Sequence, residues 1–281
     1  LIVVAVIHRF GLLDGIWNQT IHSGGIANTN TIFNLSCAFL LLPFVGIYEQ
    51  ISHRLIKDQP AAAGKYDEML DALNPVFIST PAVAFGRCYD VLLVMYHLAR
   101  TNISRAFDMF GHYDPEVREQ LEKDEDTIDT MADHVSNYLV QISTTITYHY
   151  HVEIMNYYFS AITEFERLGD HALNIAEIAA ELNKKENTFS ADALSELNVL
   201  RKLLDTILDH TNEAFRKQNL VEARQIEPLE QVVDDMVNVL KSNHLERLRN
   251  GACGVFNGSE FFNLLSEAER ISDVCSNLGV A

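Results

Sequence analysis

The sequence has few cysteines and few basic residues, and each shortage excludes a class of protein. Its four cysteines are scattered over 281 residues without a Cys-x-x-Cys pair, so neither a zinc site nor a disulfide framework is indicated. Reduced thiols in a reducing compartment are the simpler interpretation. Lys and Arg total 21 against 39 Asp and Glu, a net charge of −18. Because phosphate binding needs a basic face, this balance disfavours nucleic acid as a partner.

Prolines and catalytic motifs are also missing where they would be informative. No proline occurs between Pro115 and Pro228, which permits long helices. There is no Gly-rich phosphate loop, no Gly-x-Ser-x-Gly and no His-Glu-x-x-His, so nothing supports an enzyme that uses nucleophilic catalysis. The hydrophobic fraction of 48% is too high for a disordered chain.

Apolar residues recur at spacings of three, four and seven after residue 115, and no segment alternates as a strand does. This periodicity predicts an all-α helical bundle. The two clearest apolar faces consist of Val117, Leu121, Ile128, Met131, Val135, Leu139 and Ile142, and of Ile154, Tyr158, Phe165, Leu168, Ala172, Ile175, Ala179 and Leu182.

Charge divides the chain into a neutral head and an acidic body. Residues 1–60 have a net charge of zero, and the remaining residues carry the whole −18. Thr31–Tyr48 has eighteen residues without a charge, close to the ~20 that span a bilayer. Basic residues follow at 53–57, which predicts that this end faces the cytoplasm. We expect a membrane segment over residues 1–58. A buried helix of a soluble protein or an interfacial segment is the alternative.

The head begins inside an apolar run, Leu1–Ile7, which we expect to be the end of a longer segment. Residues 59–78 contain a Pro-Ala-Ala-Ala-Gly stretch and are predicted to be a linker. The acidic body then occupies residues 79–281.

The acidic body contains an internal repeat. The segment ERLGDHALN at residues 166–174 reappears as ERISDVCSN at residues 269–277, an offset of 103. Upstream, EDTIDTM at residues 125–131 matches EQVVDDM at residues 230–236, an offset of 105. Two motifs in the same order at nearly the same offset predict two copies of a three-helix unit, over residues 79–182 and 190–281.

Each repeated motif places acidic residues four apart, on one face of a helix, where like charges repel. Hard cations take oxygen ligands, so such pairs suit divalent or iron-type ions. A solvated helix face is the alternative, and charged faces are commonly just that. Asn174 and Asn277 are predicted to extend the two acidic stripes, while Arg167 and Arg270 point elsewhere. The candidate ligands are Glu125, Asp129, Glu166, Asp170, Glu230, Asp234, Glu269 and Asp273.

The repeated segment at residues 166–177, ERLGDHALNIAE, resembles the signature of the PhoU family of phosphate-uptake regulators. Residues 269–273 are similar to its second copy, with Ser272 in place of glycine. The resemblance implies two three-helix bundles in tandem whose Glu-x-x-x-Asp motifs bind metal ions. It makes the eight acids above candidate ligands, with Asp90 as a weaker one.

The head is similar to a late membrane segment of the sodium-dependent inorganic phosphate transporters, over ANTNTIFN at residues 27–34 and the apolar run that ends at Pro43. Bacterial members carry a PhoU-like domain after the membrane part. The Gln-Ser-Ser-Ser motifs of their sodium and phosphate sites are absent here. The chain therefore resembles the C-terminal portion of such a transporter.

These resemblances imply a cytoplasmic PhoU-like regulatory domain, residues 59–281, attached to the last membrane segments of a sodium:phosphate symporter in the cell membrane. The alternative function is a soluble PhoU-type adaptor that binds a separate transporter or a sensor kinase. The expected ligands are metal ions (Mg, Mn, Fe and Zn are not distinguished), with sodium and inorganic phosphate as the species that the parent protein transports. Homo-oligomers are also expected. A carboxylate-bridged metalloenzyme is a third alternative, but it needs Glu-x-x-His, and His171 is expected to point away from the acids.

Overall fold

The computed structural model describes residues 66–280 together with a few positions in the head, namely Thr31, residues 33–35, Cys37, Phe39, Leu40 and Leu42. The chain divides into two compact units, Leu1–Gly64 and Lys65–Ala281. Most of the predicted membrane segment lies outside the described residues. Its described positions from Thr31 to Leu40 are helical, and the apolar side chains of Phe33, Phe39 and Leu40 are exposed.

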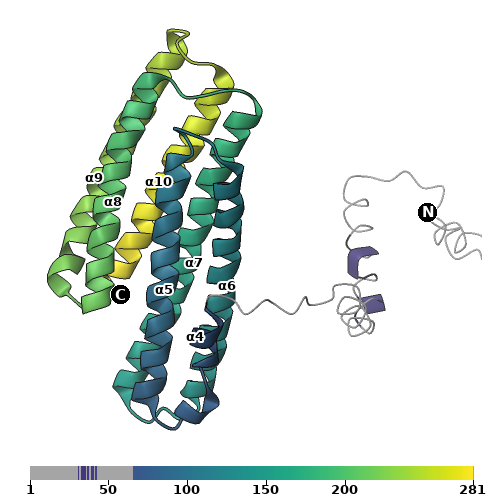
Figure 1. Ribbon diagram of the computed structural model, residues 1–281, viewed down its shortest axis with the longest axis vertical. Coiled ribbons are helices and arrows are strands. Elements are labelled where there is room, and N and C mark those ends of the chain that lie inside the picture. The colour runs from purple at the N-terminus through teal and green to yellow at the C-terminus, as the bar shows by residue number, and fades with distance from the viewer. Residues whose placement is uncertain are drawn as a thin grey trace, which may run out of the picture. The chain divides into compact units, whose positions relative to one another are not determined.

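The second unit is a set of antiparallel helices, and residues 66–280 contain no strand. This confirms the all-α prediction. The elements are α4 (Asp67–Asp71), η2 (Pro75–Phe77), α5 (Pro81–Asp108), α6 (Pro115–Ser143), α7 (His149–Lys184), α8 (Ala191–Lys217), α9 (Leu220–Arg249) and α10 (Val255–Val280). Helices α5, α6 and α7 pack on one another, as do α8, α9 and α10. The two sets meet mainly along α7 and α10, which lie side by side at the centre of the unit (Figure 1).

Local sequence explains where the helices begin and end. The side chains of Asp114, Ser190 and Asn219 cap the first turns of α6, α8 and α9 by accepting backbone N–H groups. Gln218 ends α8 in the left-handed conformation, at a φ of 49°. Pro228 lies inside α9 without ending it.

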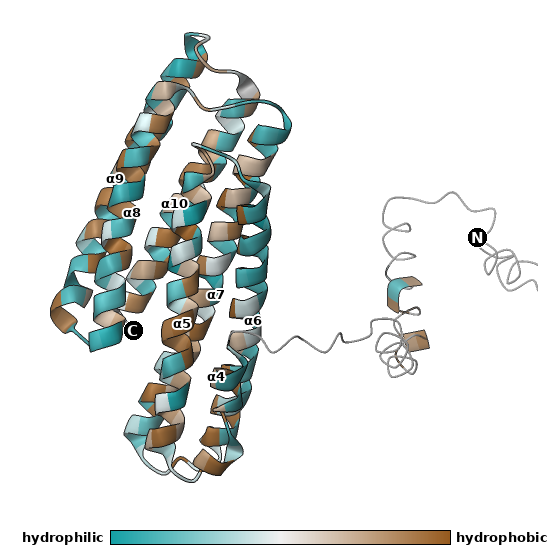
Figure 2. Cartoon of the chain, viewed as in Figure 1, coloured by the Kyte–Doolittle hydropathy of each residue, from teal (hydrophilic) through white to brown (hydrophobic). Residues whose placement is uncertain are grey.

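The predicted apolar faces are confirmed as core faces. Of the two predicted sets, Val117 and Ile154 are half-buried and the other side chains are buried. Figure 2 shows polar and apolar residues interleaved along all the long helices, as expected of amphipathic helices in a bundle. Among the described residues, α5 alone is long and apolar enough to cross a membrane by length and composition, and half of its most apolar window is buried in the bundle.

The structure corrects the C-terminal part of the predicted linker, residues 59–78. Its described residues form α4 and η2, whose side chains Met69, Leu70 and Leu73 pack against the core. Tyr138 on α6 donates a hydrogen bond to the carbonyl of Asn74 at 2.9 Å. The Pro-Ala-Ala-Ala-Gly stretch lies outside the described residues, and apolar side chains beyond it anchor the chain to the bundle.

Candidate metal centres

The acidic motifs of the first repeat face each other across two neighbouring helices. Glu125 and Asp129 lie one turn apart on α6, and Glu166 and Asp170 lie one turn apart on α7. We call these four residues the first carboxylate cluster. Burial and the negative charges of Asp129 and Asp170 raise the pKa of Glu125. Because the charge of Asp170 on α7 acts on Glu125 on α6, the two motifs belong to one electrostatic site.

The other members of the first cluster show the same repulsion. Burial, then Asp170 and Asp126, raise the pKa of Asp129. Burial, then Asp129 and Asp133, raise the pKa of Glu166. Within the described part of the chain, no ion pair joins a lysine or arginine to this cluster. The site thus concentrates negative charge that only an added cation or a proton can neutralise.

Gly169 allows the two helices of the first cluster to approach closely. A Cβ at this position would lie 3.2 Å from Cδ1 of Ile128 and 4.0 Å from Cγ of Glu125. The first distance is shorter than ordinary van der Waals contact, so a side chain at position 169 would press against Ile128. The glycine therefore lets α6 pack closely against α7. The glycine of the motif therefore helps to position the carboxylates.

The second carboxylate cluster consists of Glu230 and Asp234 on α9 and Glu269 and Asp273 on α10. Carboxylate oxygens of Glu230, Asp234 and Asp273 all lie within 4.8 Å of one another. Burial, then neighbouring carboxylates, raise the pKa values of Glu230 and Asp234. Oδ1 of Asp234 is buried and has no hydrogen-bond partner among the described residues.

The second cluster contains a cation of its own. Nζ of Lys241 on α9 donates to Oε2 of Glu269 on α10 at 3.0 Å. Asp90, the weaker candidate, forms its ion pair on α5 with Arg87 at 3.9 Å. Asp90 is not among the gathered carboxylates of the second cluster or the charges that raise pKa values in the first, so its role as a ligand stays a prediction.

The donor chemistry of both clusters fits hard metal ions. Their eight side chains offer only carboxylate oxygens, which suit Mg²⁺, Mn²⁺ and iron. In the second cluster, the buried oxygen of Asp234 without a partner is a position that a cation would satisfy, since buried polar atoms are otherwise hydrogen-bonded.

The arginine and asparagine of the repeated motif have a different role from its acids. On α7, Nη1 of Arg167 donates to Glu164 at 2.9 Å, and that glutamate also accepts from Asn277 on α10 at 3.2 Å. On α10, Nη1 of Arg270 donates to Glu267 at 2.9 Å, and Glu267 accepts from Asn174 on α7 at 3.1 Å.

The arrangement is reciprocal, so each repeat supplies an asparagine to a glutamate of the other. The expectation that both arginines point away from the acidic stripes is confirmed. The prediction that Asn174 and Asn277 extend the stripes is wrong, because their amides reach across α7 and α10.

His171 makes the reciprocal arrangement unequal. Its Nδ1 lies 2.8 Å from Oε2 of Glu267 and donates to it, since a carboxylate can only accept. Burial raises the pKa of Glu267, but hydrogen bonds from His171 and Asn174 outweigh it, and the net pKa is lowered. The equivalent of His171 in the second repeat is Val274. Because its ring faces Glu267 on α10, His171 points away from the acidic stripe, as expected.

Sequence reasoning missed Glu164 and Glu267, whose side chains are only 11% exposed. A signal was available, because the repeat extends two residues upstream as Glu-x-Glu-Arg in both copies. It also missed Lys241.

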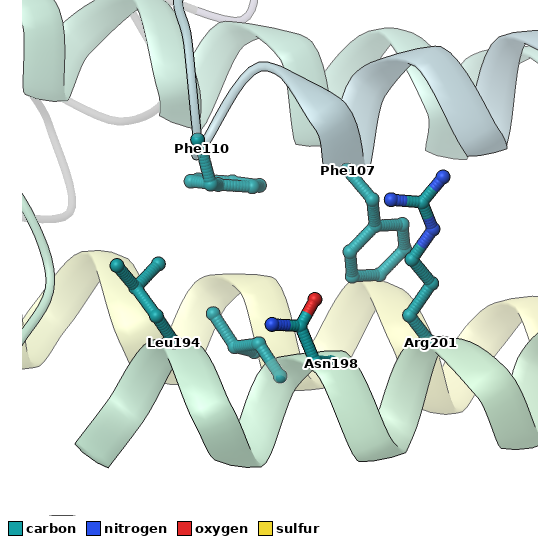
Figure 3. Close-up of a pocket in the computed structure, with 7 residues that line it drawn as sticks. Phe107, Phe110, Leu194, Asn198 and Arg201 are labelled. Carbon is teal, nitrogen blue, oxygen red and sulfur yellow. The ribbon is translucent and has the colours of Figure 1, made fainter. Parts of the chain in front are cut away.

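A small pocket lies apart from the carboxylates, where the end of α5 meets α8 (Figure 3). Its cavity volume is about 120 Å³, and Phe107, Phe110 and Leu194 give it an apolar lining. Arg201 at its edge is already paired with Asp108 at 2.5 Å and Ser104 at 2.8 Å. Because no carboxylate lines this pocket, it is separate from both clusters.

The fold and the paired acidic motifs define a tandem three-helix-bundle protein. The family model described as the PhoU domain matches residues 92–179. The phosphate-specific transport system accessory protein PhoU homolog of Clostridium acetobutylicum is 22% identical over 192 residues, 68% of this chain and 86% of that protein. The protein of the same description from Streptococcus pneumoniae serotype 4 is 24% identical over 119 residues, 42% of this chain and 54% of that protein.

Two solved structures share the fold. PhoU from Pseudomonas aeruginosa superposes with a TM-score of 0.65 at 17% identity, covering 69% of this chain and 92% of that chain. The phosphate transport system regulatory protein PhoU from Streptococcus pneumoniae gives 0.64 at 18% identity, covering 71% and 93%. The chain is therefore PhoU-like in sequence over residues 92–179 and PhoU-like in its helical-bundle fold.

Proposed function

We propose that this chain is a PhoU-type regulatory protein of phosphate uptake and signalling, rather than an enzyme. The observation that carries the proposal is the PhoU-domain match over residues 92–179, which includes the first carboxylate cluster. The likeness to a PhoU homologue over 86% of that protein's length supports it. The expected partners are a phosphate transporter or a sensor kinase that the chain binds as an accessory protein in the cytoplasm, with self-association as a further expectation.

The two carboxylate clusters are the proposed metal sites. Glu125, Asp129, Glu166 and Asp170 hold the first ion, and Glu230, Asp234, Glu269 and Asp273 surround the second. A bound cation supplies positive charge where burial and mutual repulsion raise these pKa values. Because each cluster spans two helices, its carboxylates then hold α6 to α7 and α9 to α10 more firmly. Mg²⁺, Mn²⁺ and iron suit the all-oxygen ligands better than Zn²⁺ does.

Phosphate uptake in cells is the direct test of the regulatory role. Cells lacking the chain should take up labelled phosphate at a changed rate, and the wild-type chain should restore the original rate. The variant E125Q/D129N/E230Q/D234N should restore it less well, because it removes four of the eight ligands while keeping side-chain size. Uptake that does not respond to loss of the chain would contradict the proposal.

The second candidate function is the same regulatory domain attached to a sodium-dependent phosphate transporter in the cell membrane. It is favoured by the uncharged Thr31–Tyr48 segment, where the described side chains of Phe33, Phe39 and Leu40 are exposed. In this case the chain would act on sodium and phosphate movement within its own parent protein.

Membrane extraction separates the two candidates. If the chain is attached to a transporter, the full chain should remain with membranes after alkaline carbonate washing and should need detergent for release. The substitutions F39D and L40D should weaken this retention. Full recovery in the soluble fraction without detergent would leave the adaptor as the function.

A further inference from the structure

The two carboxylate clusters differ by one positive charge. Lys241 lies on α9, seven residues after Asp234, so it is two turns further along the same helix face. The offset of 105 that relates the acidic motifs of α6 and α9 aligns Lys241 with Ser136. Serine has no charge, and the first cluster therefore has no equivalent of the Lys241–Glu269 ion pair.

Lys241 pairs with the one carboxylate of the second cluster that lies outside its closest group. The oxygens that already lie within 4.8 Å of one another belong to Glu230, Asp234 and Asp273, whereas Glu269 accepts from Lys241 at 3.0 Å. An ammonium group is a compact cation with three donors, and it competes with a metal ion for the same oxygen.

We propose that Lys241 is a built-in counter-cation that occupies Glu269, restricts the second centre to three carboxylates and weakens its affinity for divalent cations, whereas Ser136 places no charge at the matching position of the first centre. The proposal rests on the proposed metal-binding function, and it concerns the difference between the centres. It predicts unequal affinities and assigns the difference to one exchangeable pair of residues, Lys241 and Ser136.

The test examines each centre by itself in the full chain, with Mn²⁺ as the probe. E125Q/D129N disables the first centre, and E230Q/D234N disables the second. In the first background, K241S should tighten Mn²⁺ binding about tenfold in calorimetry, and tenfold corresponds to about 1.4 kcal/mol. In the second background, S136K should weaken binding by a similar factor. K241R keeps the charge and should bind as weakly as its parent.

A melting curve in chelator provides the second readout. K241S should lower the metal-free melting temperature, because Glu269 loses its cation and is repelled by the other carboxylates. The same substitution should enlarge the rise in melting temperature that Mn²⁺ produces. Unchanged or weaker Mn²⁺ affinity in K241S overturns the inference, since Lys241 would then only hold α9 to α10, and the metal function would stand. Absence of Mn²⁺ binding in both parent backgrounds overturns the metal function and the inference together.

Discussion

The two repeats share their acids, but different neighbours support those acids. In the first, Gly169 lies against Ile128, and no lysine or arginine among the described residues forms an ion pair with the cluster. In the second, Ser272 and Val233 occupy the matching positions, and Lys241 pairs with Glu269. The elements that recur are the four carboxylates and the Glu–Arg–Asn set at the junction. The carboxylates and the junction set are therefore common to both halves, whereas Gly169 and Lys241 distinguish the two centres.

The largest difference in stability is expected at the junction of α7 and α10. Glu267 has three partners in His171, Asn174 and Arg270, whereas Glu164 has two. Removal of a buried acceptor leaves its donors unsatisfied, so E267A should cost about 2–3 kcal/mol and E164A about 1–2 kcal/mol in urea unfolding. The exposed Glu177, which lies on α7 with Glu164, is the control, and E177A should change stability by less than about 0.5 kcal/mol. An equal loss of stability in E267A and E164A would contradict the expected difference between the two glutamates.

A smaller difference is expected in the pH dependence of the metal-free protein. The pKa values of Glu125, Asp129 and Glu166 are raised in the fold, so the folded state binds more protons than the unfolded state above the ordinary carboxyl pKa of about 4. Stability should therefore fall as pH rises from about 4 through those raised values.

Thermal melts in chelator between about pH 4 and pH 7 measure this effect, a range that starts at the ordinary carboxyl pKa. E125Q/D129N should flatten the decline relative to wild type. E230Q/D234N should flatten it less, because Lys241 already offsets part of the repulsion in the second cluster. An identical decline in wild type and E125Q/D129N would mean that these carboxylates do not repel.

The smallest effect concerns the close approach of α6 and α7. Serine at position 169 would crowd Cδ1 of Ile128, which lies 3.2 Å from the position of an added Cβ. Valine lacks that methyl group, as at Val233 in the second repeat. G169S should therefore be more favourable in an I128V background than in wild type, by about 0.5–1 kcal/mol in a double-mutant cycle. If the effects of G169S and I128V on stability are strictly additive, the Ile128 side chain moves aside at no cost, which would contradict this prediction.

The helical bundle could be predicted because apolar residues such as Leu121, Ile128 and Met131 follow a helical period over an uninterrupted stretch. The closeness of Glu125 to Asp170 and of Asp129 to Glu166 across α6 and α7 was accessible only through the repeat. One motif alone does not distinguish a metal site from a solvated face.

The junction and Lys241 were not predicted, because a helical period gives the face of a residue but not which neighbouring helix that face meets. Asn174 lies four residues after Asp170 and so was expected on the acidic stripe. In the structure its amide reaches Glu267, 93 positions away. Contacts of that kind depend on how α7 and α10 pack, which the local sequence does not encode.

The central claim is that the repeated carboxylates bind metal ions, and thermal melting of the metal-free full chain with Mn²⁺ tests it most directly. A free ion at about 100 times its Kd stabilises one site by about 2.7 kcal/mol, which should raise the melting temperature by about 5–10 °C. The variant E166Q/D170N/E269Q/D273N should show no such rise. No rise in the wild-type chain, or an equal rise in the variant, would contradict the claim.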